Sequence, residues 1–200
     1  MKNTTFIYIV FIVSALFTTT LQAQTEITPL YGYRFGGEFK DTLTRTTLNV
    51  TDDNIAGFLV SFDKDTHSQY EFLYSHQSSE VKSNTVIPNF DVDIDYFHFG
   101  GTALWPRDKI TPFLAGGLGL THMSPDVSGS DSATRFSFNL GGGLKWFPGK
   151  RVGIRLEARA YGTLFDSGSA IFCTNGNCNF SVSGNLFTQF ETNVGVIFRF

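Results

Sequence analysis

The sequence has little charge of either sign, few cysteines and, beyond residue 23, no long apolar run. Its 15 Lys and Arg and 18 Asp and Glu leave a net charge of −3 over 200 residues. Nucleic-acid binding requires a basic surface, so this balance argues against that class of partner. A membrane-spanning helix needs about 20 apolar residues, and no such stretch follows residue 23. Neither a nucleic-acid-binding protein nor a helical membrane protein is therefore expected.

Residues 1–23 have the pattern of a secretory signal peptide. Lys2 precedes an apolar run from Phe6 to Phe17, and a Leu-Gln-Ala tripeptide follows a few residues later. The run is too short for a membrane anchor, which is the alternative interpretation, so cleavage after Ala23 is expected. No cysteine follows the cut, which argues against lipid anchoring of the new N-terminus. Residues 24–200 are expected to form one domain.

What the chain does have is aromatic residues in alternating patterns. Aromatics are 16% of the sequence, with 22 Phe, and there are 20 Gly. In residues 185–200, one parity carries Leu186, Phe190, Val194, Val196, Phe198 and Phe200, and the other carries Gln189, Glu191, Asn193 and Arg199. Successive side chains of a strand point to opposite faces. Ordinary strands have roughly 5 or 6 residues and tilted transmembrane strands about 9–11, so the length favours a strand that spans a membrane.

Similar segments recur, and their connections alternate in length. The pattern places strands near residues 29–39, 55–62, 68–77, 92–105, 110–123, 134–147, 152–165 and 185–200. Connections 63–67, 106–109 and 148–151 are short, whereas 40–54, 78–91, 124–133 and 166–184 are longer and polar. Short periplasmic turns and long extracellular loops are typical of outer-membrane barrels. The predicted fold is all-β, a single closed antiparallel transmembrane barrel of about eight strands with both termini in the periplasm. A soluble sandwich or lipocalin-like barrel is the alternative.

Two predicted hairpins place a tryptophan beside a tight basic turn. Trp105 precedes Pro-Arg-Asp-Lys, and Trp146 precedes Phe-Pro-Gly-Lys-Arg. Tryptophan favours the boundary between membrane and water. Trp105 and Trp146 are therefore expected in the periplasmic aromatic girdle, and two buried core tryptophans are the alternative.

Charged residues of both signs fall on the polar faces of the predicted strands. This inward set comprises Arg34, Glu38, Glu71, Lys145, Arg155, Glu157, Arg159, Glu191 and Arg199. The interior of an eight-stranded barrel is just wide enough to be filled by side chains, and unpaired buried charge is costly. The sequence therefore predicts a lumen charge network around Lys145, Arg155, Glu157, Arg159 and Glu191, completed by Gln69, Asn139, Gln189 and Asn193. A selective pore is the alternative.

The chain from about residue 27 to residue 200 resembles the small outer-membrane β-barrel superfamily of the OmpA, OmpX and OmpW types, the porin-family barrel domain. The terminal pattern polar-x-Gly-x-x-aromatic-x-aromatic carries the resemblance, at Asn193, Gly195, Phe198 and Phe200. The resemblance implies location in the outer membrane, contact with its lipid and lipopolysaccharide, and recognition of this strand by the barrel assembly machinery. It implies a monomer and is silent on activity.

Catalysis has no clear sequence signature. Hydrolysis or acyl transfer needs a nucleophile, a base and an orienting acid within reach. His122 lies near Ser124 and Asp126, and His76 lies near Ser75 and Ser78, but neither neighbourhood matches a lipid A deacylase or acyltransferase signature. We therefore expect no enzyme, catalytic residue, cofactor or bound metal. His98 is expected in the barrel wall.

The predicted loops carry two further features. Cys173 and Cys178 enclose the turn-forming Thr-Asn-Gly-Asn, and in an oxidising compartment they are expected to form a local disulfide. A metal-binding pair is the alternative, although no third thiol is present.

Three aspartates alternate at the start of the fourth predicted strand. Asp91, Asp93 and Asp95 share one parity with Phe97 and Phe99. Either a bulge breaks the register here, or the strand extends above the bilayer. The aspartates are read as a solvated rim or as a divalent-cation site beside lipid head groups.

The sequence leaves three functions open. The leading one is a non-enzymatic barrel that serves envelope integrity or binds an unidentified extracellular ligand through its loops. The others are a narrow channel or hydrophobic-ligand conduit, and a lipid A-modifying enzyme. Fold alone does not choose among them.

Overall fold

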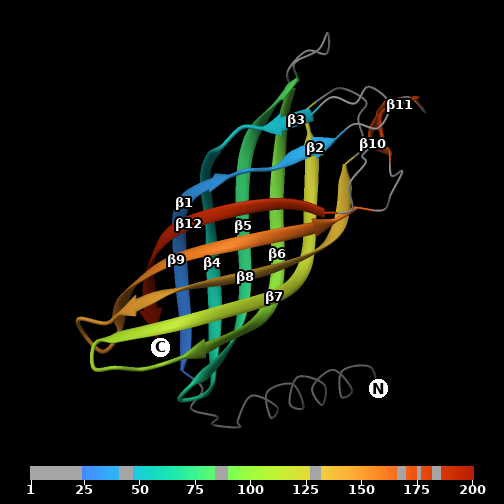
Figure 1. Cartoon of the computed structure of the whole chain (residues 1–200). Coiled ribbons are helices and arrows are strands. Elements are labelled where there is room, and N and C mark those ends of the chain that lie inside the picture. Colours follow the sequence, from blue (N-terminus) through green and yellow to red (C-terminus); the bar gives the residue numbers. More distant parts are fainter. Residues whose placement is uncertain are drawn as a thin grey trace, which may run out of the picture.

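The computed structural model shows one closed antiparallel barrel (Figure 1). It describes residues 24–40, 47–83, 90–126, 132–165, 170–174, 177–181 and 186–200. The predicted signal peptide lies outside these residues. The eight long strands are β1 (Thr25–Phe35), β4 (Asp53–Asp65), β5 (Ser68–Ser83), β6 (Phe90–Leu104), β7 (Ile110–Pro125), β8 (Ala133–Trp146), β9 (Val152–Leu164) and β12 (Leu186–Arg199). The all-β barrel predicted from the alternating segments is confirmed.

Pairing between the first and last long strands closes the barrel. Each long strand pairs with the next along the chain, and β12 returns to β1, with Arg34 opposite Glu191 and Phe35 opposite Phe190. In the part of the chain that the structure describes, no helix is long and apolar enough to cross a membrane.

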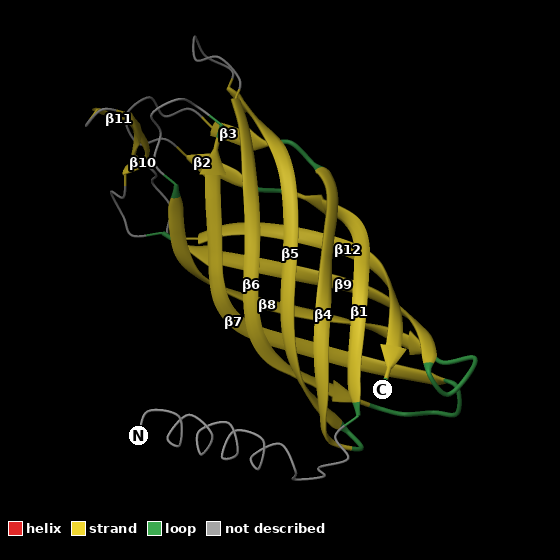
Figure 2. Ribbon diagram, turned by 180° about the vertical axis from the view of Figure 1, so that it is seen from behind, coloured by secondary structure: helices red, strands yellow, loops and turns green. Residues whose placement is uncertain are grey.

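The short turns and the chain ends lie at the same end of the barrel. The β4–β5, β6–β7 and β8–β9 turns gather there, and Figure 2 shows the C-terminus beside them. The Phe200 N–H donates a 2.9 Å hydrogen bond to the Thr25 carbonyl oxygen, which joins the two ends of the described chain. Short turns face the periplasm in outer-membrane barrels, so we call this the periplasmic end and the opposite end the extracellular end.

Four short strands lie at the extracellular end, three of them (β3, β10 and β11) in predicted loops. They are β2 (Glu38–Lys40), β3 (Thr47–Val50), β10 (Ala170–Thr174) and β11 (Asn177–Ser181). The predicted strand 29–39 is divided into β1 and β2 because Gly36 and Gly37 adopt φ of 82° and 111°, which only glycine adopts readily. β1 also begins four residues earlier than predicted, at Thr25.

Strands β5 and β6 are longer than predicted and rise beyond their neighbours at the extracellular end (Figure 1). Their pairing is continuous from Ser68 opposite Ala103 to Val81 opposite Phe90. The aspartates of β6 therefore share a face with Phe97 because the strand extends, and no bulge interrupts it.

Polarity is inverted relative to a soluble protein. Leu140 is 67% exposed and Phe99 61% exposed on the outer wall, whereas Arg34 and Arg155 in the interior are 0% exposed. Burial alternates residue by residue along β12: Phe190, Val194 and Phe198 point outward, and Gln189, Glu191 and Asn193 point inward. Such a wall is stable in lipid, where every backbone group of a closed barrel is also paired.

Candidate functional site

The barrel interior contains most of the predicted polar residues, arranged in layers. Nearest the periplasmic end, the Lys145 ammonium donates 2.6 Å hydrogen bonds to Glu26 Oε2 and to Gln69 Oε1. The Arg199 guanidinium binds the other Glu26 oxygen, Oε1, at 2.5 Å and lies 3.8 Å from the Phe147 ring centre. This group carries two positive charges around one buried carboxylate at the periplasmic mouth.

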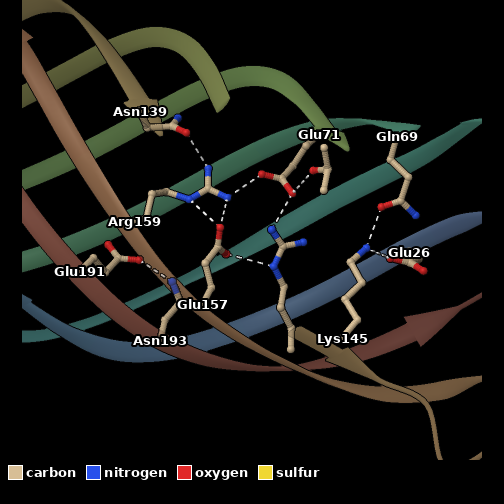
Figure 3. A network of polar contacts seen from close by, with 11 residues as sticks. Glu26, Gln69, Glu71, Asn139, Lys145, Glu157, Arg159, Glu191 and Asn193 are labelled. Carbon is tan, nitrogen blue, oxygen red and sulfur yellow. Dashed lines mark hydrogen bonds and ion pairs between the residues drawn. The ribbon is translucent and has the colours of Figure 1, made fainter. Parts of the chain in front are cut away.

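Two arginines and two glutamates form the next layer (Figure 3). Glu157 accepts from Arg155 Nε at 3.0 Å and from Arg159 Nη2 at 2.6 Å. Glu71 accepts from the same two guanidinium groups at 2.8 and 2.7 Å. Asn139 accepts a further 2.8 Å hydrogen bond from Arg159. All four charged side chains are nearly inaccessible to solvent, so the charges compensate one another inside the barrel.

A third polar layer lies above this cluster. Arg34 donates to Glu191 Oε2 through Nη2 at 2.6 Å, and Asn193 donates to Glu191 Oε1 at 2.8 Å. The Arg34 guanidinium also stacks over the Tyr96 and Tyr161 rings, at 4.7 and 5.1 Å from their centres. Aromatic faces attract cations, so the guanidinium is held by a carboxylate and by two rings.

The extracellular part of the interior is mainly apolar, which the sequence did not predict. Inward side chains near the strand ends form a buried cluster that includes Val50, Val81, Val92, Ile94, Met123, Ala133, Phe165 and Phe187. Phe165 meets Phe187 edge to face, with ring centres 6.3 Å apart. The lumen thus has polar layers near its periplasmic end and a mainly apolar layer, which includes buried Gln77, Ser79 and Gln189, near its extracellular end.

The structure places all five predicted lumen residues on the inner face of the barrel, in separate layers: Lys145, Arg155, Glu157, Arg159 and Glu191. Glu38 was also expected there, but its side chain lies outside the described residues. Glu26 was missed because the first strand was predicted to begin at residue 29. Its signal was the alternation of Glu26, Thr28 and Leu30, which continues the inward face of β1.

His98 is an interior residue, which corrects its expected place in the barrel wall. It is buried, its Nε2 lies 2.8 Å from the Ser137 hydroxyl, and its ring stacks on Tyr96 and Tyr161. The flanking Phe97 and Phe99 point outward instead.

The predicted girdle and terminal residues lie at the periplasmic end. Trp105 and Trp146 are exposed on the outer wall beside the short turns. Phe198 and Phe200 also point outward. The other two residues of the terminal pattern do not point outward. Asn193 faces the interior. Gly195 lies so close to Thr28 that an added Cβ would come within 2.6 Å of the Thr28 methyl group.

Above the apolar wall, polar side chains continue outward on β5 and β6. Asp95 accepts from the Tyr74 hydroxyl at 2.9 Å and contacts His76 Nδ1 at 2.8 Å, and Asp93 accepts from Ser78 at 2.6 Å. Asp91 is exposed on the same face. No three His, Cys, Asp or Glu side chains of the described residues converge as metal ligands would.

Cys173 and Cys178 are directly opposite each other in the β10–β11 hairpin. Their side chains lie outside the described residues, so the disulfide stays a prediction. Because a ring of this size constrains only the hairpin, replacing both cysteines with serine should leave barrel assembly and thermal stability unchanged. Mass spectrometry of the non-reduced protein should find no free thiol. Two free thiols in protein from the native envelope would contradict the disulfide, and loss of assembly would contradict its local role.

The closed wall, the inverted polarity and the filled interior define an integral membrane β-barrel. The family model described as outer membrane protein beta-barrel domain matches residues 11–200, so the chain belongs to that family and lies in the outer membrane. The resemblance inferred from the terminal pattern is confirmed. No curated protein sequence matches the chain.

Two solved structures share the fold. Neisserial surface protein A is 12% identical with a TM-score of 0.61, covering 88% of this chain and 97% of that one. Outer membrane protein AlkL, determined in lipid bilayers, is 11% identical with a TM-score of 0.58, covering 89% of this chain and 90% of that one. At these identities the likeness concerns the fold alone.

Proposed function

We propose that this outer-membrane barrel is a closed monomeric scaffold that acts through its outer surfaces and its extracellular connections, and that its lumen does not conduct. The filled interior is the observation that carries the proposal. Each polar layer joins opposite charges at hydrogen-bonding distance, and an apolar layer lies in series with them.

An ion entering from the periplasmic end would meet the buried ion pairs of the polar layers. A hollow of about 490 Å³ opens at this mouth, and Lys145, Glu26 and Arg199 are among its lining residues. Passage beyond it requires separating buried ion pairs, which leaves uncompensated charges at low dielectric and costs several kcal/mol per ion. An ion would then cross a layer in which most buried side chains are apolar, so it would regain few hydrogen-bonding partners. These two costs support a structural plug over a selective pore.

The extracellular end offers the surface for an unidentified partner. Long, polar connections on a rigid barrel are where binding residues are most often presented. The β10–β11 hairpin gives one of these connections a defined backbone. Envelope integrity and surface binding both follow from such a scaffold, because neither needs transport through the lumen.

Planar-bilayer recording tests the closed lumen. The purified protein, shown to be folded by its heat-modifiable migration on gels, is expected to insert without steady conductance steps. A variant with Glu71, Arg155, Glu157 and Arg159 all changed to serine serves as a comparison, because it empties one polar layer and leaves the apolar layer in place. Steady single-channel steps from the unmodified protein would overturn the proposal in favour of a channel.

A further inference from the structure

Three outward-facing side chains on β5 and β6 form a chain of hydrogen bonds. His76 Nδ1 lies 2.8 Å from Asp95 Oδ1, and His76 Nε2 lies 3.2 Å from the Ser78 hydroxyl oxygen. An ionised carboxylate only accepts hydrogen bonds. The Nδ1 atom therefore carries the proton given to Asp95, and Nε2 is left as the acceptor that faces Ser78.

We propose that Ser78, His76 and Asp95 form a serine-hydrolase site that cleaves the acyl ester of a membrane lipid. Nucleophile, base and orienting acid stand in the order and at the distances that define such a triad on unrelated folds. The proposal departs from the expectation of a non-enzymatic protein. The site lies on the outer wall, so it is independent of the closed lumen.

The pairing of β5 with β6 places these residues. His76 is directly opposite Asp95, and Ser78 is directly opposite Asp93. Residues two apart on a strand point to the same face, which brings Ser78 alongside His76. The Tyr74 hydroxyl donates a 2.9 Å hydrogen bond to the same Asp95 oxygen, Oδ1, and so helps to hold the carboxylate in place. His76 is 38% exposed and Asp95 is 18% exposed at the side chain, so the imidazole is accessible from outside the barrel.

The outer wall changes from apolar to polar at this position. Along β5 the outward residues change from Phe72 and Tyr74 to His76 and Ser78, along β6 from Phe99 and Phe97 to Asp95 and Asp93, and along β7 from Leu118 and Leu120 to His122 and Ser124. This change marks the boundary between lipid hydrocarbon and the head-group region. Ester groups of membrane lipids lie between their acyl chains and head groups. The site therefore faces the linkage that it would cleave, in the extracellular leaflet.

The three side chains account for the nucleophilic attack and for the proton transfers of the reaction. The Ser78 hydroxyl oxygen attacks the ester carbonyl carbon, and its proton moves to His76 Nε2. The bond between the carbonyl carbon and the alcohol oxygen then breaks, and the departing lyso-lipid takes that proton. Water attacks the acyl–Ser78 ester and gives its proton to His76, and the fatty acid leaves as Ser78 regains its proton. Asp95 is a positioning residue that holds the imidazole and balances its charge.

Asp93 competes for the nucleophile. Ser78 Oγ lies 2.6 Å from Asp93 Oδ1, and a hydroxyl can donate only one hydrogen bond at a time. When the Ser78 hydroxyl donates to Asp93, its proton is not available to His76, and this is the resting form. When the hydroxyl donates to His76 instead, the arrangement is in its reactive form. Removing the Asp93 charge should favour the reactive form, whereas a purely structural polar cluster would lose a partner.

A hollow of about 490 Å³ opens beside Ser78, over the ends of β5, β6 and β7. Its lining includes the carboxylates Asp53, Glu80, Asp91, Asp93 and Asp126. Charge complementarity favours a head group with an ammonium over one that is only anionic. Phosphatidylethanolamine fits this requirement, with its ester at the boundary and its amine toward the carboxylates.

Covalent labelling tests the nucleophile. The full-length protein, folded in phosphatidylethanolamine vesicles, is treated with an alkyl fluorophosphonate, and the modified residue is located by mass spectrometry. We expect Ser78 to be labelled and the vesicles to release fatty acid and lyso-lipid. Ser78→Ala should abolish both signals, and His76→Asn should lower both. Asp95→Asn should slow the limiting labelling rate by up to about 10⁴-fold without weakening probe binding, as loss of the triad acid does elsewhere.

Two matched variants separate catalysis from general reactivity. Ser132 is exposed just before β8 and does not line the hollow, and Ser132→Ala should leave labelling and lipid hydrolysis unchanged. Asp93→Asn should retain or increase labelling of Ser78, because the alkyl probe has no ammonium group for the carboxylates of the hollow to bind. Heat-modifiable migration checks the fold of every variant. Absence of label at Ser78 together with absence of fatty-acid release, equal labelling of Ser132, or loss of Ser78 labelling in Asp93→Asn would each overturn the proposal. None of these outcomes bears on lumen conductance.

Discussion

Replacing Glu157 with alanine is expected to lower the free energy of unfolding by about 3–5 kcal/mol, the usual cost of breaking a buried ion pair by removing one partner. Glu157 accepts hydrogen bonds from both Arg155 and Arg159. Without it, the layer keeps two guanidinium groups and only Glu71 to compensate them. Urea unfolding of the protein in lipid vesicles gives the measurement, because the midpoint and slope together report the change in stability.

A second variant distinguishes lost charge balance from lost packing. Changing Glu157 to leucine together with Arg159 to methionine removes one charge of each sign and leaves Arg155 paired with Glu71. Replacing a buried pair with apolar groups of similar size is often neutral, so the double variant should be more stable than Glu157→Ala. Lys150→Ala in the exposed β8–β9 turn should change little. An unchanged midpoint for Glu157→Ala would place that carboxylate in solvent and contradict the buried cluster.

Much of the fold follows from parity along the strands. Alternation of apolar and polar residues predicted the eight long strands, because one face of each strand meets lipid and the other meets the interior. The same rule predicts that Arg155, Glu157 and Arg159 point the same way, since they are two residues apart. Their partner Glu71 lies on a distant strand, so parity predicts that it faces inward but does not predict which cations it contacts.

The parts that the sequence could not predict depend on where a residue lies along the barrel axis, as well as on which face of its strand it occupies. His98 shares the inward parity of Val92, Ile94 and Tyr96, but its immediate neighbours are lipid-facing phenylalanines, so a local reading placed it in the wall. The apolar extracellular layer was missed for a related reason. Its residues come one or two at a time from the ends of many strands, and only closure of the barrel brings them together.

The grouping of outward-facing polar residues on β5 and β6 was also not predictable from the sequence. His76 and Ser78 are close in sequence, but the Asp95 that completes their hydrogen-bond chain lies 19 positions from His76. The β5–β6 register brings the three together, and the pattern of either strand alone does not determine how it pairs with its neighbour. A sequence search for a compact catalytic signature has no means of finding this arrangement.

Changing Phe198 to serine is expected to abolish assembly into the outer membrane, leaving unfolded protein in the periplasm. Phe198 lies on β12 between Ile27 of β1 and Val152 of β9, at the seam that closes the barrel. The terminal pattern of Asn193, Gly195, Phe198 and Phe200 implies that the assembly machinery recognises this strand, and deletion of Phe200 should have the same effect. Heat-modifiable migration of the membrane fraction measures the folded yield.

Phe190→Ser on the same strand is the matched control. Phe190 is 48% exposed and Phe198 42% exposed, both outward, so the two changes remove similar apolar contact with lipid. Phe190 lies outside the terminal pattern and nearer the extracellular end, where it stacks on Phe35 with ring centres 5.9 Å apart. If recognition of the last strand governs assembly, Phe190→Ser should assemble with reduced stability whereas Phe198→Ser should not assemble. Equal folded yields for the two variants would show that apolar contact with lipid, and not a terminal signal, determines the outcome.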